Sequence, residues 1–115
     1  AWVLWRTAAL TSSLRRRRLY GPEVAVAQVA WGLDEQELAA LVSRLAAAAG
    51  GEPRDVLVIS DSDAVHVAAA AGCRFEHLPP RADWERRIAR GDYEAFARRR
   101  VASILAGYRV GRLID

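Results

Sequence analysis

The most informative stretch of the chain is residues 55–63, which read DVLVISDSD. Its first part is an almost unbroken apolar run, and such a run is typical of a strand that is buried on both faces of a parallel sheet. The polar residues that follow at once mark the end of that strand. We therefore expect a buried strand over residues 55–60, then a short loop, and then an alanine-rich helix that runs to Ala71 and is closed by Gly72.

A second strand of the same kind precedes this one. Residues 24–30 are also nearly continuous in apolar side chains, which predicts another buried strand. The segment between the two strands is helical in pattern, because Asp34 and Glu37 have the spacing of a capping box. Apolar side chains then recur three and four residues apart until Gly50, which predicts one buried helix face. The members of this face are Leu38, Leu41, Val42 and Leu45.

The rest of the chain continues the alternation of strands and helices. Such an alternation over short loops builds a parallel sheet with helices on both faces. The sequence therefore predicts one α/β domain over residues 1–115, a three-layer Rossmann-like fold with a mostly parallel sheet of about five strands. We also expect the chain to be a piece of a longer protein, because it begins at Ala1 without a methionine. The remaining expected elements are strands at 2–5, 73–78 and 110–114, a helix at 11–20, and a helix from 82 to about 90 that restarts at 91–92.

The composition excludes several kinds of chemistry. All 17 basic residues are arginine, so a Walker phosphate loop, a Schiff-base enzyme and a pyridoxal enzyme lack the lysine that each requires. Cys73 is the only cysteine, which excludes a disulfide or a multi-thiolate metal site within the chain and favours a reducing, cytoplasmic location. The apolar runs are about ten residues long, too short for a transmembrane segment.

The arginines form two tracts, residues 15–18 and 98–100, which acid-rich segments separate in the sequence. Nucleic-acid-binding proteins gather their cations on one face and often interleave aromatic residues. Four consecutive helical residues point in four directions, so we interpret each tract as a solvated helix face. We accordingly expect no nucleic-acid partner. Contact with an anionic surface or a phosphate is the alternative.

Candidate site residues follow from the expected fold. In open parallel sheets, ligands bind outside the carboxyl ends of the strands. Applied to this chain, the rule selects the loops that follow the predicted strands. An aromatic side chain in such a loop can stack on a base or a sugar, although core packing is the more common role of tryptophan. The candidate ligand-binding residues are Trp31, Gly32, Ser60, Asp61, Asp63 and Arg81.

Asp61 and Asp63 allow three interpretations. Carboxylates at this spacing can share a divalent cation that bridges to a diphosphate, and the pattern resembles the metal-binding D-x-D of GT-A glycosyltransferases. It also resembles the first motif of haloacid dehalogenase-like phosphatases, which implies Asp61 as nucleophile and Asp63 as general acid; the further acidic pair of that family is not visible here. The simplest interpretation is structural, since both carboxylates would stabilise the N-terminus of the following helix by capping and through the helix dipole.

Residues 55–115 resemble the N-terminal half of GT-B glycosyltransferases. The resemblance rests on VLVISD at 56–61, the alanine-rich helix ending at Gly72, CRFEHLPP at 73–80, and a later arginine-rich helix and strand. It implies a Rossmann-like module of a bacterial glycosyltransferase or a related envelope-polysaccharide protein, binding a nucleotide sugar or a glycan acceptor. The donor-binding domain of that family is missing, so we expect no catalysis by this piece alone. The implied cleft residues are Trp31, Ser60, Asp61 and Asp63.

Two other functions remain open at this point. The chain could be a non-catalytic interaction domain that binds a partner domain or a second copy of itself. The arginine tracts and the tryptophan-rich segment 2–5 would suit that function, as would the lack of a glycine-rich cofactor loop, for which residues 31–33 are a poor substitute. It could also be a metal-dependent phosphatase, which needs acidic residues that the sequence does not show. His66 and His77 have no second ligand at metal-binding spacing, and we interpret both as ordinary packed or exposed residues.

Overall fold

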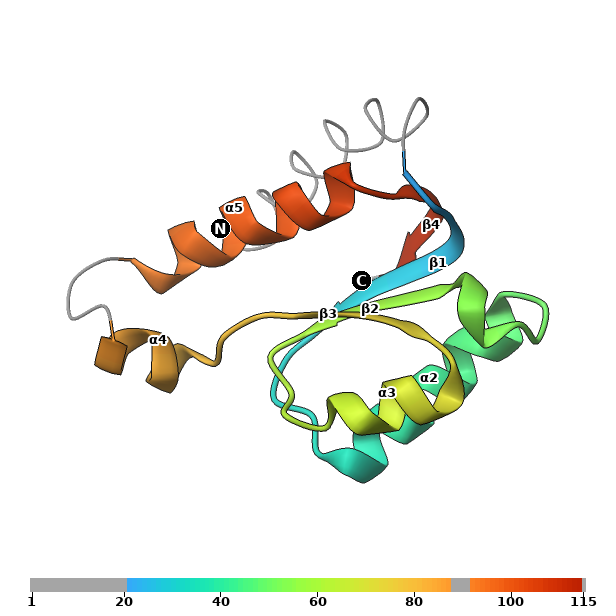
Figure 1. The fold of residues 1–115 in the computed structure, drawn as a ribbon, viewed down its shortest axis with the longest axis horizontal. Helices are drawn as coiled ribbons and strands as arrows, with labels where there is room; N and C mark the ends of the chain where they lie inside the picture. Colours follow the sequence, from blue (N-terminus) through green and yellow to red (C-terminus); the bar gives the residue numbers. More distant parts are fainter. Residues whose placement is uncertain (1–20, 88–91, 115) are drawn as a thin grey trace. The chain divides into compact units, whose positions relative to one another are not determined.

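The computed structural model describes residues 21–87 and 92–114 (Figure 1). The described residues divide into two compact units, one of residues 23–78 and 110–114 and the other of residues 21–22, 79–87 and 92–109. We call the first the sheet unit and the second, after its helices α4 (Arg81–Arg87) and α5 (Tyr93–Ala106), the α4–α5 unit. The strand expected at 2–5 and the helix expected at 11–20 lie outside the described residues.

The sheet unit is built on four strands in the order β3-β2-β1-β4. β1 pairs with β2 and β2 pairs with β3, both in parallel, with Val26 opposite Val56 and Val58 opposite Phe75. The carboxyl ends of these three strands therefore meet at one edge of the sheet. In chain order the elements are β1 (Glu23–Ala30), α2 (Glu35–Ala48), the 3-10 helix η1 (Pro53–Asp55), β2 (Val56–Ser60), α3 (Val65–Ala71), β3 (Arg74–His77) and β4 (Arg109–Ile114).

The predicted α/β fold with a parallel sheet is confirmed. The number of strands differs from the prediction, because the described residues contribute four strands to the sheet and not about five. The additional strand was expected at residues 2–5, on the basis of tryptophan and β-branched side chains, and that segment is not described. Helices on both faces of the sheet, as in a three-layer domain, stay a prediction.

Helix α2 begins as its sequence predicts. The Asp34 carboxylate accepts a hydrogen bond from the backbone N–H of Glu37 at 2.8 Å, and the Glu37 carboxylate accepts one from the N–H of Asp34 at 3.2 Å. These two bonds form the capping box, and they satisfy two backbone donors that a helix start otherwise leaves unpaired. The cap fixes where the loop after β1 ends and α2 starts.

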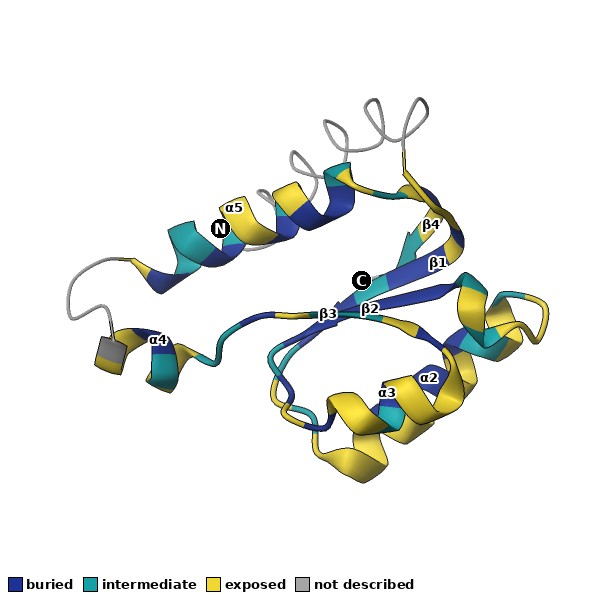
Figure 2. Cartoon of the chain, viewed as in Figure 1, coloured by how far each residue is buried: buried dark blue, intermediate teal, exposed yellow. Residues whose placement is uncertain are grey.

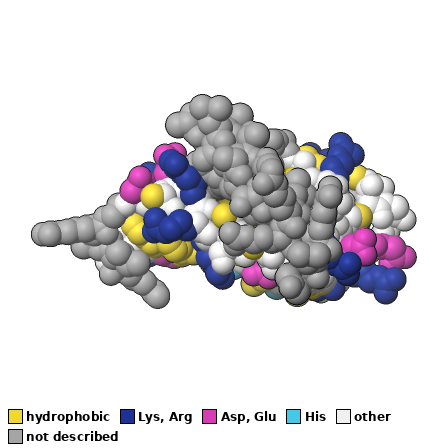
Figure 3. Space-filling model, turned by 90° about the horizontal axis from the view of Figure 1, so that it is seen from above, with side chains coloured by type: hydrophobic (Ala, Val, Ile, Leu, Met, Phe, Trp, Pro, Cys, Tyr) yellow, Lys and Arg dark blue, Asp and Glu magenta, His cyan; other side chains and the backbone are white. Residues whose placement is uncertain are grey.

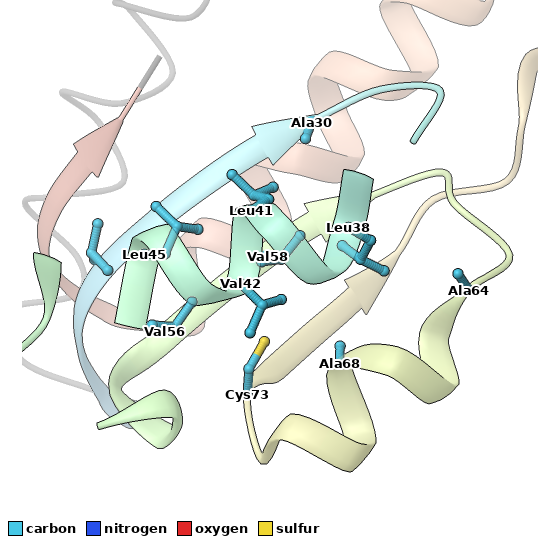
Figure 4. Packing of buried hydrophobic residues seen from close by; sticks show 11 residues of the cluster. Ala30, Leu38, Leu41, Val42, Leu45, Val56, Val58, Ala64, Ala68 and Cys73 are labelled. Atoms are coloured by element: carbon cyan, nitrogen blue, oxygen red, sulfur yellow. The ribbon is translucent and has the colours of Figure 1, made fainter. Parts of the chain in front are cut away.

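Helices α2 and α3 cover one face of the sheet (Figures 1 and 2). The apolar face of α2, including Leu38 and Leu41, packs against Val56 and Val58 of β2, and Ala68 of α3 joins the same cluster (Figure 4). Residues on the opposite face of the sheet are buried as well. Leu57 and Ile59 of β2 and Ala27 of β1 have no exposed surface, which agrees with the prediction of strands that are buried on both faces.

Cys73 belongs to the core cluster beneath α2 (Figure 4). Burial raises the pKa of its thiol to about 11, because the apolar surroundings disfavour the charged thiolate. At pH 8 the folded protein therefore holds about 100-fold less thiolate than the unfolded chain does. Because the pKa is raised on folding, the contribution of this group to stability is complete below pH 9 and is lost as the pH rises toward 11.

We expect Cys73 to react with a thiol reagent at least about 100-fold more slowly in the native protein than in urea at pH 8. The rate of alkylation followed by mass spectrometry measures this directly, since the chain has one cysteine. The Cys73→Ser variant gives the background rate. Equal rates in the native and unfolded states would contradict the placement of Cys73 in the core.

The α4–α5 unit contains α4 (Arg81–Arg87) and α5 (Tyr93–Ala106). Asp92 caps α5 by accepting a hydrogen bond from the N–H of Glu94 at 3.0 Å. The rings of Trp84 and Tyr93 meet edge to face at a centroid distance of 5.7 Å, and Trp84 stacks on Phe96 at 5.5 Å. These aromatic contacts join the two helices. None of the helices within residues 21–87 and 92–114 has the length and apolar character needed to cross a membrane.

Candidate functional site

Two hydrogen bonds join the loop after β1 to the loop after β2. The Asp61 carboxylate accepts a hydrogen bond from the backbone N–H of Gly32 at 2.8 Å, and the Ser62 hydroxyl donates one to the carbonyl of Leu33 at 2.8 Å. Both loops leave the same edge of the sheet, because β1 and β2 are parallel neighbours. The two loops therefore form one connected surface at the carboxyl ends of the strands, where the fold predicts a ligand.

Ser60 and Ser62 are buried hydroxyl residues within this connection. Ser60 has no exposed surface, and its hydroxyl accepts a hydrogen bond from the N–H of Ser62 at 3.1 Å. The Ser62 hydroxyl accepts one from the N–H of Ala64 at 3.2 Å in addition to its bond to Leu33. Each hydroxyl is thus satisfied inside the protein, as buried polar groups require. The buried Ser60 hydroxyl therefore holds the backbone of the loop that follows β2.

The structural interpretation of Asp61 and Asp63 as caps is wrong. Helix α3 begins after Ala64, and no side chain forms a cap hydrogen bond at its start. Asp61 bonds instead to the neighbouring loop, and Asp63 has one carboxylate oxygen 3.9 Å from Nε2 of His77. The sequence pattern suggested caps because both residues precede a helix. The Asp61 carboxylate bonds to the neighbouring loop instead, and the Asp63 side chain is 91% exposed.

An open hollow of about 340 Å³ lies beside this connection, at the start of α2 and α3. The imidazole Nε2 of His66 on α3 lies 2.9 Å from a carboxylate oxygen of Glu35 in the first turn of α2, so this pair links the two helices beside the hollow. The residues lining it are Leu33, Asp34, Glu35, Ser62, Asp63, Ala64 and His66.

The lining of the hollow has a distinct electrostatic character. Three of its residues, Asp34, Glu35 and Asp63, carry carboxylates, and none is an arginine. Ionised carboxylates only accept hydrogen bonds. The hollow is therefore suited to a ligand rich in hydroxyl or amino donors, whereas a free diphosphate would be repelled unless a cation lay between.

A metal role for Asp61 and Asp63 rests on these two carboxylates alone. Within residues 21–87 and 92–114, no group of three or more His, Cys, Asp or Glu side chains is arranged to hold a metal ion. One oxygen of Asp61 is already occupied by the N–H of Gly32. A divalent cation at this pair stays a prediction.

The other predicted site residues fall in different places. Trp31 is half-buried at the end of β1, directly before the connection, and Gly32 has a positive φ of 66° that suits glycine. Arg81 belongs to the α4–α5 unit, where its guanidinium lies over the ring of Tyr93 at 5.2 Å. Of the six predicted ligand-binding residues, only Asp63 lines the hollow. The sequence did not indicate the other lining residues, which are Leu33, Asp34, Glu35, Ser62, Ala64 and His66. The capping box marked Asp34 as the start of a helix, but His66 had no local signal.

We expect Asp61→Ala to lower the free energy of unfolding by about 1 kcal/mol, because the N–H of Gly32 loses its partner in a solvent-accessible loop. Asp61→Asn should restore most of that loss, since the amide oxygen can accept the same bond. Asp63→Ala is the matched control, because its side chain is 91% exposed and has no hydrogen bond to the backbone of the other loop. Urea denaturation of the three variants measures these differences. Equal losses for Asp61→Ala and Asp63→Ala would contradict a structural role of the Gly32 bond.

Comparison with known proteins finds no matching family model, no matching curated protein and no matching solved structure.

Proposed function

We propose that the chain is a Rossmann-like module of a glycosyltransferase or a related polysaccharide protein, and that the hollow beside the Gly32–Asp61 bond takes a hydroxyl-rich ligand such as a glycan acceptor. The observation that carries this proposal is the lining of the hollow, with Asp34, Glu35 and Asp63 at its surface. Sugar hydroxyls donate hydrogen bonds to carboxylates, and such pairs orient sugars without a cofactor.

The position of the hollow supports the same function. It lies next to the carboxyl ends of two parallel strands, the usual place for ligands in this fold class. The acidic lining favours an acceptor over a nucleotide-sugar donor, because the diphosphate of a donor is itself negative. The resemblance of residues 55–115 to the N-terminal half of GT-B enzymes points in the same direction.

The test is thermal unfolding of the protein with glucose, N-acetylglucosamine, and UDP-glucose with or without Mg²⁺ or Mn²⁺. A ligand at about 100 times its dissociation constant adds about 2.7 kcal/mol, which corresponds to a shift of several degrees. We expect such a shift with a sugar, and we expect Glu35→Gln with Asp63→Asn to remove it. Glu23→Gln is the control, because Glu23 is exposed at the opposite end of β1.

Each of three other results would contradict the proposal and indicate a different site or function. A shift only with UDP-glucose and a metal ion, lost in Asp61→Ala, would make the D-x-D a metal-assisted donor site. No shift with any ligand, together with a mass that rises with protein concentration, would favour the interaction domain. A sugar shift that persists in the double variant would place the sugar elsewhere.

A further inference from the structure

Strand β3 is an edge strand of the sheet. It stands at one end of the strand order and pairs with β2 on its inner side, and within residues 21–87 and 92–114 no strand lies on its outer side. The N–H of Leu78 donates to the carbonyl of Ser60 on β2 at 2.9 Å. Successive residues of a strand direct their backbone groups to alternate sides, so those of Phe75 and His77 point away from β2. Such an edge can pair with a further strand.

The side chains of β3 divide between the two faces of the sheet. Phe75 packs against the core cluster beneath α2, and its ring stacks on that of His77 at a centroid distance of 6.4 Å. Arg74 and Glu76 therefore lie together on the opposite face, because neighbouring residues of a strand alternate. One basic and one acidic side chain thus stand two residues apart on the same face of the edge strand.

This order of charges is complementary to itself in one antiparallel register. With Phe75 opposite Phe75 of a second copy, the outward backbone groups of these two residues bond to each other. Arg74 then lies opposite Glu76 of the second copy, and Glu76 opposite its Arg74, so two opposite-charge pairs form across the new strand pair. Glu76 also interacts within its own chain, and its two carboxylate oxygens can accept from more than one donor. Sliding the strands by two residues places arginine opposite arginine or glutamate opposite glutamate.

The other edge strand, β4, lacks this property. Its charged residues are Arg109 and Arg112, and Arg109–Ile114 contains no acidic residue, so pairing β4 with itself brings no opposite charges together. Mixed charge alone is common on the chain, since Figure 3 shows arginine and acidic side chains next to each other at several places on one face of the molecule. The order of the charges along an edge strand is what distinguishes β3.

We propose that β3 pairs in antiparallel with β3 of a second copy of the chain, centred on Phe75, so that two sheets join across a two-fold axis. Four residues from each copy make a small interface, and the dimer is accordingly weak and dependent on concentration. The proposal goes beyond the sugar-binding function. It uses none of the residues that line the hollow, so sugar binding and dimer formation are tested separately.

The test is sedimentation velocity of the whole chain at concentrations from about 10 μM to 1 mM, the range in which a weak interface assembles. We expect the weight-average mass to rise from that of one chain toward that of two. Arg74→Glu and Glu76→Arg should each raise the dissociation constant of the dimer by at least about tenfold, because each variant places two pairs of like charges opposite each other. An equimolar mixture of the two variants should recover the dimer, since two acidic side chains then face two basic ones.

Glu23→Arg is the matched control, because it makes the same change of charge as Glu76→Arg at an exposed position on β1. Circular dichroism of each variant checks that the fold is retained. A mass that does not change with concentration would overturn the proposal, as would dimers that both single variants retain or that their mixture fails to recover. Hydrogen exchange identifies another occupant. Protected amides at Phe75 and His77 in a monomeric chain would show that a segment of the same chain covers the edge, which also overturns the proposal.

Discussion

Replacing Leu38 by alanine is expected to lower the free energy of unfolding by about 2 to 5 kcal/mol. Leu38 has no exposed surface and packs in the cluster between α2 and the sheet (Figure 4). Its truncation removes buried apolar area and leaves a cavity that the neighbouring side chains fill only in part. Domains of this size have a total stability of about 5 to 15 kcal/mol, so a large fraction of the native stability would be lost. Urea denaturation followed by circular dichroism measures the change.

The matched control for this substitution is Val65→Ala. Val65 lies on α3 in the same unit, but it is 47% exposed. Its truncation leaves no cavity, and alanine is the better helix former. We expect a change within about 0.5 kcal/mol. Similar losses for Leu38→Ala and Val65→Ala would contradict the core that the structure places beneath α2.

Gly21→Ala is expected to lower the free energy of unfolding by about 3 kcal/mol. Gly21 has a φ of 88°, which side chains rarely adopt, and an added Cβ would collide with the backbone carbonyl of Gly107. The segments cannot easily separate, because the N–H of Arg109 donates to the carbonyl of Pro22 at 2.8 Å and its Nε donates to the carbonyl of Gly21 at 2.9 Å. Thermal and urea unfolding measure the loss.

Gly50→Ala separates the strain of a positive φ from the collision of an added Cβ with neighbouring atoms. Gly50 has a similar φ of 80°, but no atom lies within 4 Å of the place that a Cβ would occupy. Only the backbone strain applies there, so we expect a loss of about 1 kcal/mol. If Gly21→Ala is no more destabilising than Gly50→Ala, the close contact between Gly21 and Gly107 is not present in solution.

The strands and helices that the sequence predicted best are those with a strong local signal. The apolar runs at 24–30 and 55–60 became β1 and β2 within one residue at each end, and the pair Asp34 and Glu37 formed the expected capping box. These features depend on side chains that are close in sequence. Local patterning predicts them because a strand buried on both faces needs a short run of apolar residues, and a capping box needs two polar residues at a fixed spacing.

The candidate site was predicted only in part. The rule for parallel sheets selected the two loops that the structure joins, but the partners of Asp61 and Ser62 lie 29 residues away, and no local pattern indicates such bonds. His66 illustrates the same limit, because its contact with Glu35 joins two helices.

The most direct test of the site is a two-dimensional ¹H–¹⁵N NMR titration of the labelled chain with N-acetylglucosamine. The backbone N–H groups of Gly32, Glu35 and His66 report on the hollow and on the loops that form it. We expect the largest chemical-shift changes to fall within residues 32–35 and 62–66 and to saturate together. Changes confined to other segments, or no changes at high sugar concentration, would contradict a sugar site in the hollow.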